Sequence, residues 1–237
     1  MTELLRSFLR AGRVRRIKRK IDRVGTGAYR PGGSSKPGHL YSPLPFPAFD
    51  DVPWQREACA ERLALIRESM PNRFRGGRLL DIGCCTGFNC FKLCEDGFRC
   101  IGIDIDPDSI EIASDVARLY RVPVNFRTGE ATLEVIDSLG RFDVVLFLSS
   151  FQWVTAARGY EYACALLKSV MRQSSVMFFE TSMGAEGRAK MPMLPDADAV
   201  QSLLEETAVH TKVQRLGDVT APNAWLKKSR ALFRTES

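Results

Sequence analysis

Short apolar runs alternate with amphipathic stretches over most of the chain beyond residue 75. Runs such as RLLDIG at 78–83 are typical of buried strands, and the stretches between them carry apolar residues three and four apart, which is typical of helices. The run FDVVLFLSS at 142–150 is apolar at successive positions, which indicates a strand buried on both faces. Strands that alternate with helices predict a doubly wound α/β domain with a mostly parallel, seven-stranded sheet.

The expected elements follow this pattern in chain order. The predicted strands cover residues 78–83, 99–105, 122–128, 142–150, 174–181, 211–217 and 230–236. Between them we expect one helix after the first strand that ends near Asp96. Four further helices are expected at 106–120, 132–139, 160–173 and 196–208. Asp106 is interpreted as a helix N-cap and Gly97 as a C-cap, because these residue types suit those positions.

Three segments are expected along the chain: an arm at 1–24, an irregular connector at 25–50 and the α/β domain at 51–237. The arm has two apolar stripes that do not align across Gly12, which predicts a helix in two pieces. The stripes are Leu4, Leu5, Phe8 and Leu9, and then Val14, Ile17, Ile21 and Val24. The connector is rich in Gly, Pro and Ser and could form a lid. Asp51 and Pro53 are expected to open a helix that runs to Met70.

Charge is concentrated in the arm. The net charge is +6, but residues 1–24 hold nine Lys/Arg against Glu3 and Asp22, a local +7 that leaves about −1 for the remainder. Such an arm suits an anionic membrane surface, nucleic-acid phosphates, a partner protein or an organelle-targeting role. The first stripe (Leu4, Leu5, Phe8 and Leu9) favours peripheral membrane contact, and the scarcity of aromatic residues in the arm weakens a nucleic-acid role such as tRNA binding.

The composition indicates a soluble protein of the cytoplasm. Seven cysteines, an odd number mostly at apolar positions, fit a reducing compartment. We find no apolar run long enough for a transmembrane helix and no signal-peptide pattern at the start. The expected location is therefore cytoplasmic, with a peripheral position on the inner face of the membrane as a further expectation.

The stretch LLDIGCCTGF at 79–88 ends the first predicted strand with a glycine loop. Gly83 and Gly87 would let the backbone approach a ligand, and the following helix offers free N–H groups. Asp104 ends the second strand 21 residues after Gly83, a spacing typical of an acid that binds ribose hydroxyls. A nicotinamide enzyme is disfavoured, because position 85 lacks the glycine of a pyrophosphate loop and Asp81 would repel a pyrophosphate.

Four successive segments together resemble a known family. LLDIGCCTG, GIDIDPDSIEIA, FRTGEA and FDVVLFLSS resemble, in order and spacing, the nucleotide-binding segments of class I S-adenosylmethionine-dependent methyltransferases. The resemblance covers roughly residues 76–237 and implies a Rossmann-like fold with S-adenosylmethionine as the cofactor. The family's loop usually has glycine where this chain has Cys85, which could narrow the loop around the methionine.

The resemblance also implies roles for individual residues. Asp81 would support the loop and the methionine ammonium group, Asp104 would hold the ribose, and Ile105 would cover the adenine. Glu130 would accept the adenine amino group, or remain a solvated loop acid. The expected cofactor-binding residues are Asp81, Gly83, Cys85, Gly87, Asp104, Ile105, Glu130 and Ser149, with Ser149 and Ser150 beside the transferred methyl.

The acceptor and the catalytic residues are less well defined by the sequence. The segment SSFQWV after the fourth strand lacks the motifs of adenine-amine and cytosine-C5 methyltransferases. Gln152 and Glu180 are candidates for catalysis, each with an equally reasonable structural role, and His39 is a candidate general base if the connector folds over the site. His210 is interpreted as structural or solvated. No metal site is expected, since adjacent cysteines are a poor start for tetrahedral zinc.

Three functional hypotheses follow. The first is methylation of a hydroxyl or similar group on a small-molecule, glycan or lipid-linked acceptor. The second is a tRNA-modifying methyltransferase, because YSPLPFPAFDDVPW and FFETS are loosely similar to proteins related to wobble-uridine methyltransferases. In that group the segment ahead of the domain helps to cover the cofactor. The third is a non-catalytic nucleotide-binding module that kept the fold.

Overall fold

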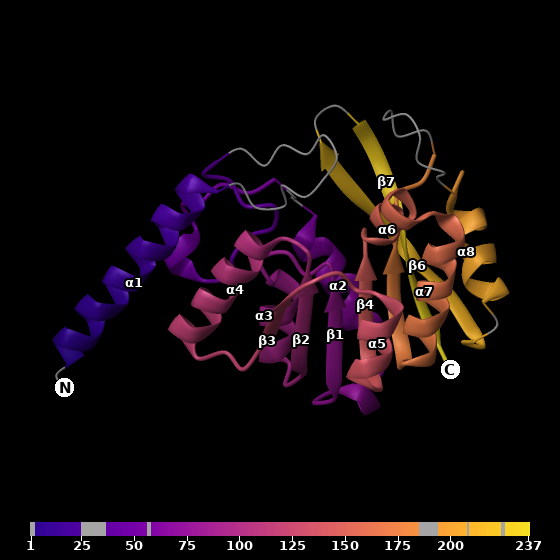
Figure 1. Cartoon of the computed structure of the whole chain (residues 1–237), viewed down its shortest axis with the longest axis horizontal. Helices are drawn as coiled ribbons and strands as arrows, with labels where there is room; N and C mark the ends of the chain where they lie inside the picture. The colour runs from indigo at the N-terminus through magenta and orange to yellow at the C-terminus, as the bar shows by residue number, and fades with distance from the viewer. Residues whose placement is uncertain (1–2, 25–36, 56–57, 185–193, 208, 224–225) are drawn as a thin grey trace.

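Seven strands form one sheet in the order β3-β2-β1-β4-β5-β7-β6, as the computed structural model shows (Figure 1). The structure describes residues 3–24, 37–55, 58–184, 194–207, 209–223 and 226–237, and the side chains of 9–24, 37–55, 58–184, 194–207, 209–219 and 230–237. The strands are β1 (Arg78–Ile82), β2 (Arg99–Asp104), β3 (Asn125–Thr128), β4 (Phe142–Leu148), β5 (Ser174–Glu180), β6 (Lys212–Asn223) and β7 (Leu226–Glu236). Strands β1 to β5 pair in parallel, and β7 runs antiparallel between β5 and β6. The predicted seven-stranded, mostly parallel sheet is confirmed.

Helices cover both faces of the sheet. One apolar cluster joins the sheet to α2 (Cys59–Ser69), α3 (Phe88–Glu95) and α4 (Pro107–Tyr120). The cluster on the other face includes residues from α5 (Leu133–Leu139), α6 (Phe151–Arg158), α7 (Tyr160–Arg172) and α8 (Ala197–Glu206). Two short 3-10 helices, Pro47–Phe49 and Asn72–Phe74, lie in the connections. This two-sided burial explains why the central strands are apolar at nearly every position.

The sheet contains a switch point between β1 and β4. From β1 the chain moves outward through α3 to β2, and from β3 it returns across the sheet to pair β4 with β1. In open α/β sheets, a crevice forms beyond the carboxyl ends of the strands at such a point. The glycine loop and the residues after β4 therefore meet at one edge of the sheet.

The arm is one helix, α1 (Glu3–Arg23), and the predicted break at Gly12 is wrong. The second apolar stripe is buried on the domain, with Ile17 only 3% exposed and Ile21 1% exposed against residues of the connector and α4. Lys20 adds ion pairs to Glu111 and, at 2.7 Å, to Asp115 of α4. Packing of this stripe stabilises a continuous helix more than a single exposed glycine destabilises it. The side chains of Leu4, Leu5 and Phe8 lie outside the described set.

Two further predictions about elements are corrected by the structure. The helix expected from Asp51 and Pro53 begins at Cys59, because the chain at Trp54 pairs with Leu40 in a short bridge instead. Asp51 makes an ion pair with Lys18 of α1 at 2.6 Å. Helix α6 was not expected, and β6 and β7 extend beyond the predicted 211–217 and 230–236.

The predicted helix cap at Asp106 is confirmed. Its side chain accepts a hydrogen bond from the Asp108 N–H at 3.1 Å, and Pro107 occupies the first position of α4. Gly97 follows α3 with a left-handed φ of 91°, as expected after a helix C-terminus. The two caps fix where α3 ends and α4 starts on either side of β2. The acid that ends β2 is therefore held close to the start of α4.

Candidate functional site

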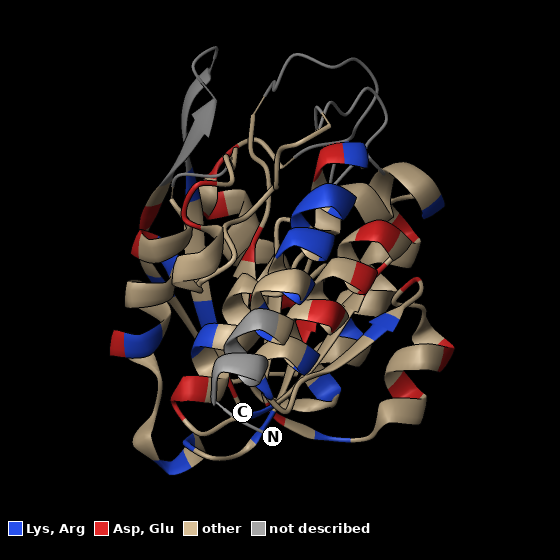
Figure 2. Cartoon of the chain, turned by 90° about the vertical axis from the view of Figure 1, so that its left-hand side faces the viewer, with Lys and Arg blue, Asp and Glu red and all other residues tan. Residues whose placement is uncertain are grey.

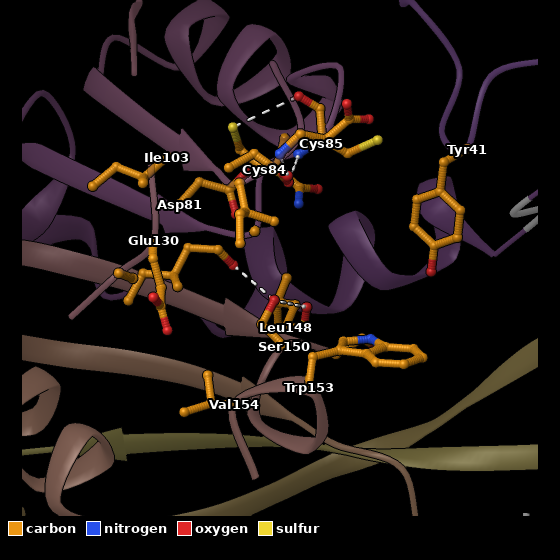
Figure 3. Close-up of a pocket in the computed structure, with 18 of the residues that line it drawn as sticks. Tyr41, Asp81, Cys84, Cys85, Ile103, Glu130, Leu148, Ser150, Trp153 and Val154 are labelled. Atoms are coloured by element: carbon orange, nitrogen blue, oxygen red, sulfur yellow. Dashed lines mark hydrogen bonds between the residues drawn. The ribbon is translucent and has the colours of Figure 1, made fainter. Parts of the chain in front are cut away.

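A cavity of about 420 Å³ opens beyond the carboxyl ends of β1, β2 and β4 (Figure 3). Its lining includes seven of the eight predicted cofactor residues, which come from four separate segments: Asp81, Gly83, Cys85, Asp104, Ile105, Glu130 and Ser149. The structure thus brings together residues that are up to 68 positions apart. The eighth, Gly87, is not among the described lining residues.

The glycine loop is held by backbone hydrogen bonds from β2. The N–H groups of Gly83 and Cys84 both donate to the Ile103 carbonyl, at 2.8 and 3.1 Å. Gly83 has a φ of 76°, and a Cβ there would lie 2.1 Å from the Ser150 hydroxyl oxygen. A side chain at 83 would therefore be strained in this conformation and would force the Ser150 hydroxyl, in the wall of the cavity, to move.

Gly87 has a role within the fold. It is the N-cap of α3 with a φ of 84°, and a Cβ there would lie 2.4 Å from the ring of Phe126. This glycine allows α3 to start against β3. Its conformation and close packing account for the glycine, and the expectation that Gly87 also packs against a ligand stays a prediction.

Cys85 adopts a left-handed conformation, with a φ of 51°, that a glycine would adopt without strain. Its side chain is buried, and its sulfur lies 3.7 Å from the Ser109 hydroxyl. The loop thus keeps the backbone conformation expected of glycine while carrying a side chain that lines the cavity. The proposed narrowing of the loop stays a prediction.

Asp104 is fixed at the end of β2 by two backbone donors. Its Oδ2 accepts from the Cys85 N–H at 2.7 Å, and its Oδ1 accepts from the Asp106 N–H at 2.9 Å. The carboxylate therefore ties the glycine loop to the start of α4 and faces the cavity at a set position. Ile105, the next residue, is 44% exposed, an unusual exposure for a large apolar side chain, and it lines the same cavity.

Asp81 is a buried acid whose charge is only partly compensated. It is 1% exposed, and burial raises its pKa to about 7, although Arg62 and hydrogen bonds from Cys90 and Asn89 act in the opposite direction. The Cys90 sulfur lies 3.6 Å from Asp81 Oδ2. Such a carboxyl gains stability when a cation approaches it.

Two buried polar atoms near Asp81 have no hydrogen-bond partner among the described residues: Nε of Arg62 and Oδ1 of Asn89. Both residues line the cavity. The Arg62 donor suits the carboxylate of a free amino acid. The Asn89 acceptor and the Asp81 carboxyl suit its ammonium group. The site thus fits the methionine part of the cofactor that the resemblance implies. Arg62 and Asn89 were not predicted, because nothing in the sequence places them beside Asp81.

Glu130 lines the cavity but is engaged by a cation. Arg158 donates to its two oxygens at 3.0 and 2.7 Å, and this hydrogen bonding lowers the pKa of Glu130. The arrangement orients the carboxylate at the end of β3. Its predicted contact with an adenine amino group stays a prediction.

The catalytic candidates lie behind the cavity wall. Glu180 is 0% exposed at the end of β5, where it accepts a hydrogen bond from Ser149 and faces Arg62 at 3.4 Å and Arg230 at 3.6 Å. Gln152 is buried and bonds the Ser149 carbonyl at 2.8 Å and Thr181 at 3.1 Å. Neither residue lines the cavity, and both connect the ends of β4 and β5.

The two histidines lie outside the cavity lining as well. His39 is half-buried, and its Nδ1 lies 3.4 Å from the Pro37 carbonyl. His210 is buried and contacts Thr235 at 2.6 Å and the Met171 carbonyl at 2.8 Å, and burial lowers its pKa. The structure thus gives His210 the structural position that was predicted.

Aromatic residues gather at one end of the cavity. Tyr41, from the connector, and Trp153, from α6, lie at the same end, whereas Ile103 and Glu130 lie at the other (Figure 3). The neighbour of Tyr41, Ser42, bonds Thr86 of the glycine loop through its hydroxyl and its carbonyl, both at 3.2 Å. The described part of the connector is therefore fastened to the site, a contact suggested in the sequence only by the loosely matching segment ahead of the domain.

All seven cysteines are free thiols. Within the described residues there is no group of three or more His, Cys, Asp or Glu side chains that could hold a metal ion. Burial raises the pKa of Cys84 and of Cys90 well above the ordinary value. These two thiols therefore stay protonated and pack as small apolar groups.

Known proteins resemble the chain in sequence over this same region. A family model described as a methyltransferase domain matches residues 79–173. A ubiquinone biosynthesis O-methyltransferase of Rhizobium etli is 26% identical over 224 residues, which are 94% of this chain and 84% of that protein. A protein of the same name from Rhodopseudomonas palustris is 28% identical over 162 residues, and the match spans 68% of this chain but only 59% of that protein.

Solved structures show the same fold. WbdD, described as a bifunctional kinase-methyltransferase, superposes with a TM-score of 0.71 at 23% identity, over 84% of this chain and 44% of WbdD. The N-terminal domain of EvdMO1, solved with SAH bound, superposes with a TM-score of 0.65 at 17% identity, over 96% of this chain and 97% of that domain. The chain therefore has the Rossmann-like fold of class I methyltransferases. Together with the sequence match over 79–173, these likenesses support a class I S-adenosylmethionine-dependent methyltransferase.

Proposed function

We propose that this protein binds S-adenosylmethionine and methylates a hydroxyl or similar group of a small-molecule, glycan or lipid-linked acceptor. One observation carries the proposal: a single cavity joins the fixed Asp104 carboxylate to the partly compensated Asp81 beside Arg62 and Asn89. These are the groups that a nucleoside linked to an amino acid requires. The matched region covers 59% of the R. palustris relative.

Different residues would bind different parts of the cofactor. Asp104 would accept hydrogen bonds from the ribose, and Ile105 would cover the adenine. Asp81 and Asn89 would accept from the ammonium group, and Arg62 would donate to the carboxylate. When bound, the cofactor supplies a methyl group on a positively charged sulfur, which is an electrophile in itself.

The acceptor would enter at the aromatic end of the cavity. Trp153 and Tyr41 offer flat faces there, and Ser149 and Ser150, which follow β4, line the same cavity. The described lining residues include no histidine, so catalysis would rest mainly on holding the acceptor oxygen in line with the methyl carbon. The relatives' names, which specify O-methyltransferases, support an oxygen acceptor.

Comparative mass spectrometry tests the acceptor class. Extracts of cells that lack this gene are compared with extracts of cells that carry the wild type or Asp104→Ala. We expect a small molecule, glycan or lipid that is lighter by one CH₂ without the gene and with Asp104→Ala. Trp153→Ala should restore the product only partly and raise the KM for the acceptor more than that for the cofactor. A missing methyl group found only in tRNA would instead support the tRNA hypothesis.

The location is also proposed. No helix among the described residues is long and apolar enough to cross a membrane. The seven free cysteines support a location in the reducing cytoplasm. The basic α1 supports a peripheral position on the inner face of the membrane, where lipid-linked acceptors would be within reach.

A further inference from the structure

Helix α1 presents one face to the domain and another to solvent. The inner face is fixed by Ile17 and Ile21 in the apolar cluster, by the ion pairs of Lys20, and by Arg10, whose guanidinium lies 4.7 Å from the centre of the Tyr120 ring. The orientation of the helix is therefore set by the fold. Its second apolar stripe is buried against the domain and is not available to a membrane.

The outer face carries four arginines. At about 100° per residue, Arg15, Arg16, Arg19 and Arg23 lie within an arc of about 100° on the side opposite Ile17 and Ile21. All four are exposed, and none lies within ion-pair distance of a carboxylate in the described part of the chain. Figure 2, which faces the side of the molecule where α1 lies, shows Lys and Arg in blue along this helix.

Leu9 extends the same face towards the N-terminus. It is 47% exposed, the most exposed large apolar side chain among the described residues, and it lies close in angle to Arg16. Guanidinium groups next to an exposed apolar side chain match a surface of anionic headgroups above acyl chains. Nucleic acid fits less well, because Phe8 is the only aromatic residue in the sequence of α1, which leaves few rings on which bases could stack.

We propose that the outer face of α1, formed by Leu9, Arg15, Arg16, Arg19 and Arg23, docks the protein on anionic phospholipid. Because the domain holds the helix from the inner side, the helix lies along the membrane surface and does not insert. This inference deepens the peripheral location proposed above and is independent of methyl transfer. Protein that binds vesicles without binding S-adenosylmethionine would retain the docking surface and overturn only the proposed enzyme.

Vesicle co-sedimentation of the full chain tests the proposal. The probes are vesicles of phosphatidylcholine alone and of equal parts phosphatidylcholine and phosphatidylglycerol, at an ionic strength of about 0.1 M. We expect binding to the anionic vesicles only. Each arginine removed should weaken partitioning about fivefold, so Arg15→Gln, Arg16→Gln, Arg19→Gln and Arg23→Gln combined should weaken it at least about a hundredfold.

A matched variant removes the same charge elsewhere. Arg75, Arg99, Lys168 and Arg172 are exposed, lie outside α1 and the cavity lining, and can be changed to Gln together. This variant should bind like the wild type, and circular dichroism melting should show that both variants fold. Equal losses in both variants, binding to neutral vesicles alone, or binding to tRNA without binding to vesicles would each overturn the proposal.

Discussion

The acids Asp81 and Glu180 are equally buried but differently compensated. Glu180 faces two arginines and accepts the Ser149 hydroxyl, and its carboxylate is enclosed behind the cavity wall. Asp81 lines the cavity, and burial dominates over its favourable contacts, so its pKa rises to about 7. Burial alone therefore does not distinguish a ligand-binding acid from a structural one. The distinction lies in whether the protein itself supplies the compensating charge.

The largest expected effect is on stability, at Glu180. Glu180→Gln leaves the buried Arg62 and the half-buried Arg230 without this carboxylate, which should lower the free energy of unfolding by about 3–5 kcal/mol. Urea denaturation measures this loss. The folded fraction should bind S-adenosylmethionine with an affinity within a few-fold of wild type. A variant of unchanged stability would show that this cluster is not the structural anchor described above.

Asp81→Asn should have the opposite effect on stability. The pKa of Asp81 is raised in the folded state, so the folded protein keeps this proton while the unfolded chain loses it, and stability falls as pH rises from about 4 to 7. Removing the charge should therefore stabilise the ligand-free protein by about 2–4 kcal/mol at pH 8, and by almost nothing at pH 4. Thermal or urea unfolding at the two pH values checks the sign. A destabilised variant at pH 8 would contradict the assignment.

The same acid predicts the pH dependence of cofactor binding. If the ammonium group of the ligand binds the ionised Asp81, binding below the pKa must release a proton. The affinity should fall about tenfold for each pH unit below 7 and level off above 8. Titration of the wild type at several pH values tests this, and Asp81→Asn should bind more weakly and lose this dependence. If the affinity of Asp81→Asn fell with pH as steeply as that of the wild type, a group other than Asp81 would be responsible for the pH dependence.

The smallest expected effect concerns Cys85. Replacement by glycine relieves a left-handed conformation, a gain of about 1 kcal/mol, and removes a buried side chain, a loss of similar size. The melting temperature should therefore change by only a few degrees. Cofactor affinity should stay within a few-fold, with Cys85→Ser as the control that keeps a side chain. A large loss of affinity in Cys85→Gly alone would show that the thiol contributes to the ligand site.

The sequence predicted the sheet and most of the lining because both depend on local patterns. The strand runs, the Asp106 cap and the spacing from Gly83 to Asp104 are all readable within a few dozen residues. Arg62 and Asn89 could not be found in this way, since their importance comes from unpaired atoms that only the packed fold creates beside Asp81.

The errors have the same origin. The break expected at Gly12 and the helix expected from Asp51 followed local preferences, and both were overridden by packing of α1 and the connector on α4. Gln152 and Glu180 had residue types suited to catalysis, but both are buried behind the cavity wall. There Gln152 bonds Ser149 and Thr181, and Glu180 accepts from Ser149. The residues next to a side chain in the sequence do not determine whether it points into the cavity or lies behind the cavity wall.

Calorimetric titration of the purified protein with S-adenosylmethionine tests the central claim most directly. The wild type should bind one equivalent at pH 8. Asp104→Ala removes the acid that faces the cavity and accepts hydrogen bonds from the Cys85 and Asp106 N–H groups. This variant should bind at least about a hundredfold more weakly, a loss of about 2.7 kcal/mol. No heat of binding from the folded wild type, or equal affinity in Asp104→Ala, would contradict the assignment of this cavity as the cofactor site.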